Sequence, residues 1–242
     1  MKIVAIIQAR MGSTRLPRKV LMELIGEPLL AHVVKRTGRA KTISNIVVAT
    51  TVKQMDDVIV QLCQQNGWLC FRGDEQDVLD RYYQAAVEYQ ADVIVRITSD
   101  CPLIDPEIID RVVGEYLKNP SLDYVSNTLA PRTFPRGLDV EVVSFAALKC
   151  AWKEDNNHEW REHVTPYIYR HPEKFSIGTV VNDKDLSYMR WTVDTSEDLD
   201  FVLRIYEHFR HDRFSWKEVL ALLEKHPEWL EINRHIKQRQ VP

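Results

Sequence analysis

The first loop of the chain, at residues 8–19 (Q-A-R-M-G-S-T-R-L-P-R-K), combines a flexible backbone with concentrated positive charge. Its cations are Arg10, Arg15, Arg18 and Lys19, and residues 1–22 contain no Asp or Glu. The loop matches neither the P-loop nor the G-x-G-x-x-G fingerprint of dinucleotide-binding proteins. However, Gly12 permits unusual backbone angles, Ser13 adds a hydroxyl, and exposed N–H groups in such a turn can face an anion. We therefore predict a polyphosphate-binding loop; the alternative is a solvated basic loop.

Two aspartates, Asp100 and Asp194, each lie just beyond the carboxyl end of an expected strand. Mg²⁺ is usually bound by one or two protein carboxylates, with phosphate oxygens and water completing its coordination. Asp105 precedes a proline and suits a helix N-cap, and Thr195 or Ser196 can cap the helix that follows Asp194. Asp194 then has no evident structural task. We expect Asp100 and Asp194 to form a metal-binding pair.

The second half of the chain carries polar residues that could bind an acceptor molecule, namely Asn127, Arg136, Asp139, Glu141 and His163. Asp139 and Glu141 are two apart in an expected strand, so they share one face. Acids are depleted in strands, which makes the pair informative, although a solvent-facing sheet surface is the alternative. The histidines of H-E-W-R-E-H are five apart, whereas a zincin helix needs four. His163 is thus either an ordinary helix residue or a substrate contact.

The elements that must position these residues alternate over the first 120 residues. Short apolar runs predict strands at residues 3–7, 46–49, 68–71 and 93–97. Helical spacing of apolar residues predicts helices at residues 28–39, 56–65, 77–89 and 106–117. This alternation indicates an α/β fold with parallel strands and helices on both faces. Ligands of such sheets bind beyond the carboxyl ends of the strands, where the basic loop and Asp100 fall.

The pattern changes after residue 120. We expect strands at residues 123–126, 140–143, 175–181 and 188–193, a helix at 158–170, and an amphipathic helical tail from residue 197. No linker is long enough to separate domains. The chain is therefore expected to form one α/β domain with an inserted β region.

Composition excludes several classes of protein. With 32 Lys+Arg against 35 Asp+Glu, the net charge of −3 is unlike that of a nucleic-acid-binding protein. No stretch approaches the ~18 apolar residues of a membrane span. There is no C-x-x-C pair and no signal-peptide pattern, so we expect a cytoplasmic protein without zinc and with reduced thiols at Cys63, Cys70, Cys101 and Cys150. Cys101 is expected to be a small buried residue.

Several ordered segments resemble the cytidylyltransferase family, which includes the sugar-activating 3-deoxy-manno-octulosonate and acylneuraminate cytidylyltransferases. The strongest likeness is to the branch named after spore coat polysaccharide biosynthesis protein F. The segments that carry the resemblance are residues 7–21, 71–73 with 77–83, 98–106, 134–141, 162–168 and 193–199.

The resemblance implies a Rossmann-like nucleotidyltransferase fold, similar to that of the A-type glycosyltransferases. It implies transfer of a cytidylyl group from CTP to a sugar or sugar phosphate with release of pyrophosphate, in surface or spore-coat polysaccharide biosynthesis. It also implies a homodimer. The single domain, 1–242, would comprise a nucleotide-binding half (1–120), a sugar-side half (121–195) and a helical tail (196–242).

The resemblance also implies roles for individual residues. Mg²⁺ would be held by Asp100 and Asp194, and catalysis would rest on Arg15, Lys19 and Asp100. The acceptor would contact Asn127, Arg136, Asp139, Glu141 and His163. The nucleotide would be bound by Ala9, Arg10, Gly12, Ser13, Arg15, Lys19, Arg72 and Arg81.

Two departures limit the resemblance. Gln8 stands where the sugar-acid enzymes usually have proline, so their substrate is not carried over, and Thr51 stands where the family often has an acid. One alternative is a nucleotide-sugar-dependent glycosyltransferase, although Ser99-Asp100-Cys101 lacks the usual Asp-x-Asp and Asp139-Val140-Glu141 resembles it only loosely. Another is a nucleotide-binding protein of the same fold without turnover. The missing glycine fingerprint disfavours an NAD-dependent oxidoreductase.

Overall fold

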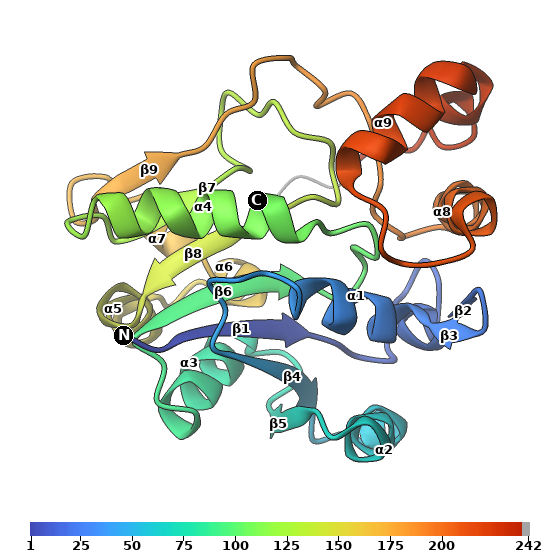
Figure 1. Ribbon diagram of the computed structural model, residues 1–242. Helices are drawn as coiled ribbons and strands as arrows, with labels where there is room; N and C mark the ends of the chain where they lie inside the picture. Colours follow the sequence, from blue (N-terminus) through green and yellow to red (C-terminus); the bar gives the residue numbers. More distant parts are fainter. Residues whose placement is uncertain (239–242) are drawn as a thin grey trace.

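The computed structural model describes residues 1–238 and contains a seven-stranded sheet in the order β5-β4-β1-β6-β8-β7-β9 (Figure 1). Strands β5, β4, β1 and β6 run parallel, β8 is antiparallel to both of its neighbours, and β9 is parallel to β7. The predicted α/β fold class is confirmed. The strands are β1 (Ile3–Gln8), β4 (Asn45–Thr51), β5 (Leu69–Gly73), β6 (Val93–Thr98), β7 (Tyr124–Ser126), β8 (Glu141–Ser144) and β9 (Ile177–Thr179).

Helices cover both faces of this sheet, which is why β1 reads as an unbroken apolar run. Ile3, Ala5 and Ile7 belong to the core shared with α1 (Leu29–Thr37), α2 (Asp57–Asn66) and α4 (Pro106–Lys118). Val4 and Ile6 belong to a second core, shared with α3 (Val78–Glu88), α5 (Phe145–Glu154) and α7 (Pro166–Tyr169). The alternation of side chains along β1 thus assigns one residue set to each layer.

The C-terminal helices α8 (Ser196–Phe209) and α9 (Trp216–Lys225) lie beyond one end of α1 and α4 (Figure 1). The Tyr206 hydroxyl donates to Pro102 O at 2.7 Å, and Trp216 N donates to Asp105 Oδ2 at 2.8 Å. These bonds attach the tail to the loop after β6. The short helix η3 (Pro227–Glu231) follows. Within the described part of the chain, no helix is both long and apolar enough to cross a membrane.

Two predictions of local structure were wrong, and two elements were not predicted. The helix expected at 158–170 is split into α6 (His158–His163) and α7, because Val164 has a φ of 71° and Pro166 begins a new helix. The strand expected at 188–193 forms only an isolated bridge between Arg136 and Arg190. Helix α5, capped by Ser144, and the small hairpin of β2 (Glu23–Leu24) and β3 (Glu27–Pro28) were not predicted.

Candidate active site

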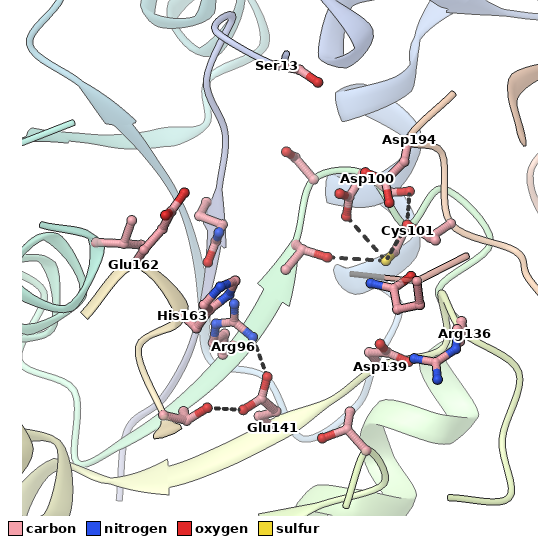
Figure 2. Close-up of a pocket in the computed structure, with 18 of the residues that line it drawn as sticks. Ser13, Arg96, Asp100, Cys101, Arg136, Asp139, Glu141, Glu162, His163 and Asp194 are labelled. Carbon is pink, nitrogen blue, oxygen red and sulfur yellow. Dashed lines mark hydrogen bonds and ion pairs between the residues drawn. The ribbon is translucent and has the colours of Figure 1, made fainter. Parts of the chain in front are cut away.

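A cavity of about 1060 Å³ opens beyond the carboxyl ends of β1 and β6. The loop after β1 and the loop after β6 line one side of it. The segment 128–139, β8 and α6 line the other (Figure 2). This is the edge of the sheet at which the sequence predicted a site. Of the predicted residues, the cavity is lined by Ala9, Arg10, Ser13, Arg15, Lys19, Arg81, Asp100, Arg136, Asp139, Glu141, His163 and Asp194.

Lys19, in the short helix η1 (Lys19–Leu21), joins the two predicted metal ligands. Its Nζ donates to Asp100 Oδ2 and to Asp194 Oδ1, each at 2.8 Å, and to Val193 O at 3.0 Å. Burial disfavours the charged form of Lys19 and Asp100, but their ion pair outweighs it. The pKa of Lys19 is therefore raised and that of Asp100 is lowered to about 2. The two carboxylates converge on one point, which is occupied by the ammonium group of Lys19.

Asp194 is also contacted by two arginines. Arg15 Nη2 lies 2.9 Å from Asp194 Oδ2, and Arg190 Nη2 donates to the same oxygen at 2.8 Å. The helix that follows is capped by Thr195, whose side chain accepts from Asp198 N. Asp194 takes no part in that cap, which leaves its carboxylate to face the cavity.

Asp105 and Cys101 have the structural places expected of them. Asp105 Oδ1 accepts from Glu107 N at 2.8 Å, as the N-cap of α4, and Cys101 is buried beside Asp100. No group of three or more His, Cys, Asp or Glu side chains that could hold a metal occurs between residues 1 and 238.

The basic loop is shaped by Asp56, a buried residue that the sequence did not single out. Its Oδ1 accepts from Met11 N at 2.7 Å, and its Oδ2 accepts from the Thr51 hydroxyl. Thr51, which the family comparison marked as a departure, thus fixes the carboxylate that holds the loop. Gly12 does not line the cavity, and a Cβ at its position would lie 3.6 Å from Glu75. The sequence around Asp56 does not indicate this role, because Met11, the loop residue that it holds, lies 45 residues away.

Two predicted nucleotide-binding arginines differ sharply in position. Arg81 is 2% exposed and lines the cavity, and its Nε and Nη1 have no hydrogen-bond partner within residues 1–238. Burial, and after it the positive charge of Arg10, lower the pKa of Arg81, although the neighbouring Tyr82 opposes the shift. Arg72 lies outside the cavity lining, because it donates to Thr51 O and Lys53 O and pairs with Asp57. We therefore omit Arg72 and Gly12 from the nucleotide site.

The far side of the cavity carries four of the five predicted acceptor residues, namely Arg136, Asp139, Glu141 and His163 (Figure 2). Glu141 is buried, accepts from Tyr124 Oη at 2.7 Å, and also bonds with Arg96 and Thr165. Asp139 pairs with Arg132. Both carboxylates face the cavity, as their spacing predicted, but both are already paired.

Arg136 and His163 differ from those paired acids. No side-chain partner of the Arg136 guanidinium is found in the described chain, and burial together with neighbouring Arg132 lowers its pKa. Burial, followed by the field of Arg96, lowers the pKa of His163, which favours the neutral ring.

Asn127 does not line the cavity. Its Nδ2 donates to Leu138 O at 2.7 Å, and its Oδ1 accepts from Val140 N at 2.9 Å. Both ends of the buried amide are therefore engaged in holding the segment that precedes β8. The prediction that Asn127 contacts the acceptor is wrong in this structure, because its hydrogen-bonding groups are used within the fold.

Comparison with known proteins agrees with this geometry. The family model described as cytidylyltransferase matches residues 4–236. The spore coat polysaccharide biosynthesis protein SpsF of Bacillus subtilis is 34% identical over 238 residues, which cover 93% of this chain and 95% of the relative. A 3-deoxy-manno-octulosonate cytidylyltransferase of Trichlorobacter lovleyi is 41% identical over 122 residues, covering 50% of this chain and 48% of the relative.

A solved structure resembles the whole chain. A cytidylyltransferase from Leptospira borgpetersenii superposes with a TM-score of 0.92 at 34% identity, covering 99% of this chain and 100% of that one. The family and the branch named from the sequence motifs are thereby confirmed.

Proposed function

Since this chain belongs to the cytidylyltransferase family, we propose that it transfers a cytidylyl group from CTP to an oxygen of a sugar or sugar phosphate. The observation that carries the proposal is the convergence of Asp100 and Asp194 on one cation position, directly beside an acid-free basic loop. A polyphosphate bound to that loop would present its oxygens to the two carboxylates and their cation.

The reaction would be an in-line displacement at the α-phosphorus of CTP. Any proton on the acceptor oxygen passes to water, and this oxygen forms a bond to the α-phosphorus. The bond between the α-phosphorus and the oxygen that bridges to the β-phosphate breaks, and that oxygen leaves with pyrophosphate. Such chemistry depends mainly on positioning and on charge stabilisation. Arg15 and Lys19 would neutralise the leaving pyrophosphate, since both side chains already extend to Asp194 inside the cavity.

Asp100 and Asp194 also fit Mg²⁺, because two carboxylates that converge on a cation can share it with phosphate oxygens. When bound there, Mg²⁺ would neutralise charge on the phosphate oxygens. Lys19 would then leave the position between the carboxylates and donate to the triphosphate. The ammonium thus holds the two acids in place in the free protein, where their mutual repulsion would otherwise separate them.

Arg81 and Arg136, two cavity arginines without a side-chain partner among residues 1–238, are assigned to different ligands. Arg81 is buried with free N–H groups, and an isolated buried donor is costly unless a ligand supplies an acceptor. We assign it to the nucleotide, together with Ala9, Arg10 and Ser13. Arg136, with Asp139, Glu141 and His163 nearby on the far wall, is assigned to the acceptor.

The glycosyltransferase alternative is weakened because its loosely matching motif does not converge on one cation position. Asp139 pairs with Arg132 and Glu141 with Arg96, whereas Asp100 and Asp194 share one ammonium group. In the same proposal, the activated sugar would enter polysaccharide synthesis, as the name of the SpsF relative suggests, and the enzyme would act as a homodimer.

The proposal is tested by pyrophosphate release from CTP and Mg²⁺ in the presence of a panel of sugars, sugar acids and sugar phosphates. At least one acceptor should yield pyrophosphate and a CMP-linked product in equal amounts. The Asp100→Asn variant should yield neither. Release of a nucleoside diphosphate from a nucleotide sugar, without pyrophosphate from CTP, would favour the glycosyltransferase instead.

A further inference from the structure

Arg190 is a buried residue that the sequence did not single out, and it connects Asp194 to the start of α8. Its Nε donates to Asp198 Oδ1 at 2.8 Å, and its Nη2 donates to Asp198 Oδ2 at 2.9 Å and to Asp194 Oδ2 at 2.8 Å. Asp198 is fully buried and accepts from Asp194 N at 2.9 Å. The guanidinium fork is thus fixed on Asp198 and extends one N–H to the neighbouring carboxylate.

This arrangement determines which oxygen of Asp194 faces Asp100. Oδ2 is held by Arg190 and Arg15, so that Oδ1 is the oxygen directed at Lys19 and the cation position. Asp198 also offsets the charge of Arg190. Arg190 is therefore shared between two carboxylates and is not the counter-ion of Asp194 alone.

The C-terminal segment, residues 232–238, is distant from Arg190 in the sequence but is hydrogen-bonded to it. Asn233 is buried, and its Nδ2 donates to Arg190 O and to Asp198 Oδ1, each at 2.9 Å. Gln238 Oε1 accepts from Arg190 Nη1, and both Lys237 and Gln238 line the cavity. The segment therefore bonds to the backbone and to the guanidinium of Arg190, and it forms part of the cavity wall.

We propose that the C-terminal segment is part of the active site, and that Arg190, held by Asn233 and Gln238, is a positioning residue that orients Asp194 toward the metal and the nucleotide. The inference rests on the proposed function. It adds to that function a structural requirement: residues at the end of the chain must be in place for Asp194 to present Oδ1. Partners that orient a metal ligand typically change metal affinity or activity by about 10–100-fold when they are removed.

The test compares three variants with the unmodified protein. Arg190→Lys keeps the charge but cannot contact Asp194, Asp198 and Gln238 together, and Gln238→Ala removes only the outermost contact. Arg234→Ala is the matched control, because Arg234 is exposed in the same segment and pairs with Glu231. Binding of Mn²⁺–CTP without acceptor is measured by water proton relaxation enhancement, alongside the melting temperature and the binding of metal-free CTP in EDTA.

We expect Arg190→Lys to weaken Mn²⁺–CTP binding about 10–100-fold. Gln238→Ala should weaken Mn²⁺–CTP binding several-fold at an unchanged melting temperature. Each variant should bind metal-free CTP as the unmodified protein does, and Arg234→Ala should also bind Mn²⁺–CTP with unchanged affinity. If Arg190→Lys fails to fold, Gln238→Ala decides the question. Lowered stability with unchanged Mn²⁺–CTP affinity in both variants would show a purely structural role and overturn the inference. No binding of Mn²⁺–CTP by the unmodified protein would overturn the proposed metal site itself, and this inference with it.

Discussion

Arg15 and Lys19 both bring positive charge to Asp194, but their side chains differ in what they can do. Lys19 is a compact ammonium enclosed by three oxygen acceptors. Arg15 is partly exposed and presents a planar fork of donors to the cavity, with one nitrogen on Asp194. A fork of this kind can bind phosphate through two parallel hydrogen bonds, whereas an ammonium acts as a point charge.

The Arg15→Lys substitution should therefore lower kcat/KM for CTP even though the charge is kept. We expect a loss of about 10–100-fold, because a hydrogen bond to a charged group contributes about 1.5–3 kcal/mol. Arg18→Lys is the matched control, since Arg18 lies in the same loop but does not line the cavity. Pyrophosphate release at the unmodified rate by Arg15→Lys would refute the role assigned to the guanidinium.

At the scale of elements, Lys19 ties η1 to the loop after β6 and to the segment before α8. The pKa of Asp100 is lowered to about 2 by this ion pair, although burial opposes the shift. A carboxyl whose pKa is lowered by folding stabilises the protein above its unfolded pKa, and this contribution is lost as the pH falls through the folded pKa.

The Lys19→Met substitution should consequently destabilise the protein in a pH-dependent way. The difference in free energy of unfolding from the unmodified protein should be fully present above pH 4 and should shrink as the pH falls toward 2, where Asp100 becomes protonated. Urea unfolding at a series of pH values measures it. A difference as large at pH 2.5 as at pH 6 would show that Lys19 contributes by packing alone.

Segment 134–139 contacts the segment that precedes Asp194, residues 188–193, and this contact depends on one glycine. Gly137 has a φ of 103°, and a Cβ there would lie 2.6 Å from Trp191 C and 2.7 Å from Thr192 N. Arg136 is hydrogen-bonded to the same segment, since Trp191 N donates to Arg136 O at 2.6 Å. Because the two segments approach so closely, Arg136 and Asp194 lie on neighbouring stretches of backbone.

Gly137→Ala should destabilise the protein by about 1–3 kcal/mol, through both the left-handed backbone and the overlap with Trp191. Gly114→Ala in α4 is the opposite control. No atom lies within 4 Å of a Cβ at Gly114, and alanine is favoured over glycine in a helix by about 1 kcal/mol. Thermal unfolding should therefore give changes of opposite sign. Equal melting temperatures for the two variants would contradict the close approach.

At the scale of the whole molecule, sequence reasoning predicted what depends on local pattern. Buried strands, helical spacing and polar residues at strand ends were enough to place Arg15, Lys19, Asp100 and Asp194 in one cavity. It could not predict contacts that join distant segments. Arg190 and Gln238, which are 48 residues apart, carry no shared local signal. Asn127 was misread for the same reason, because its partners are set by the packing of segment 137–140.

The small net charge of −3 conceals a local separation of opposite charges. The acid-free loop carries positive charge, and two carboxylates approach it from the loop after β6 and from the segment before α8. A small anionic ligand carrying a cation would bridge the two. Binding should stabilise the folded chain by mass action, by about 2.7 kcal/mol at a ligand concentration 100 times its Kd.

The most direct test of the central claim is the shift in melting temperature produced by CTP, UTP, ATP and GTP, each with Mg²⁺, in the unmodified protein and in Asp100→Asn. The account predicts a shift of several degrees with CTP, smaller shifts with the other three nucleotides, and loss of the CTP shift in Asp100→Asn. Equal shifts with all four nucleotides, or a CTP shift that survives in Asp100→Asn, would contradict it.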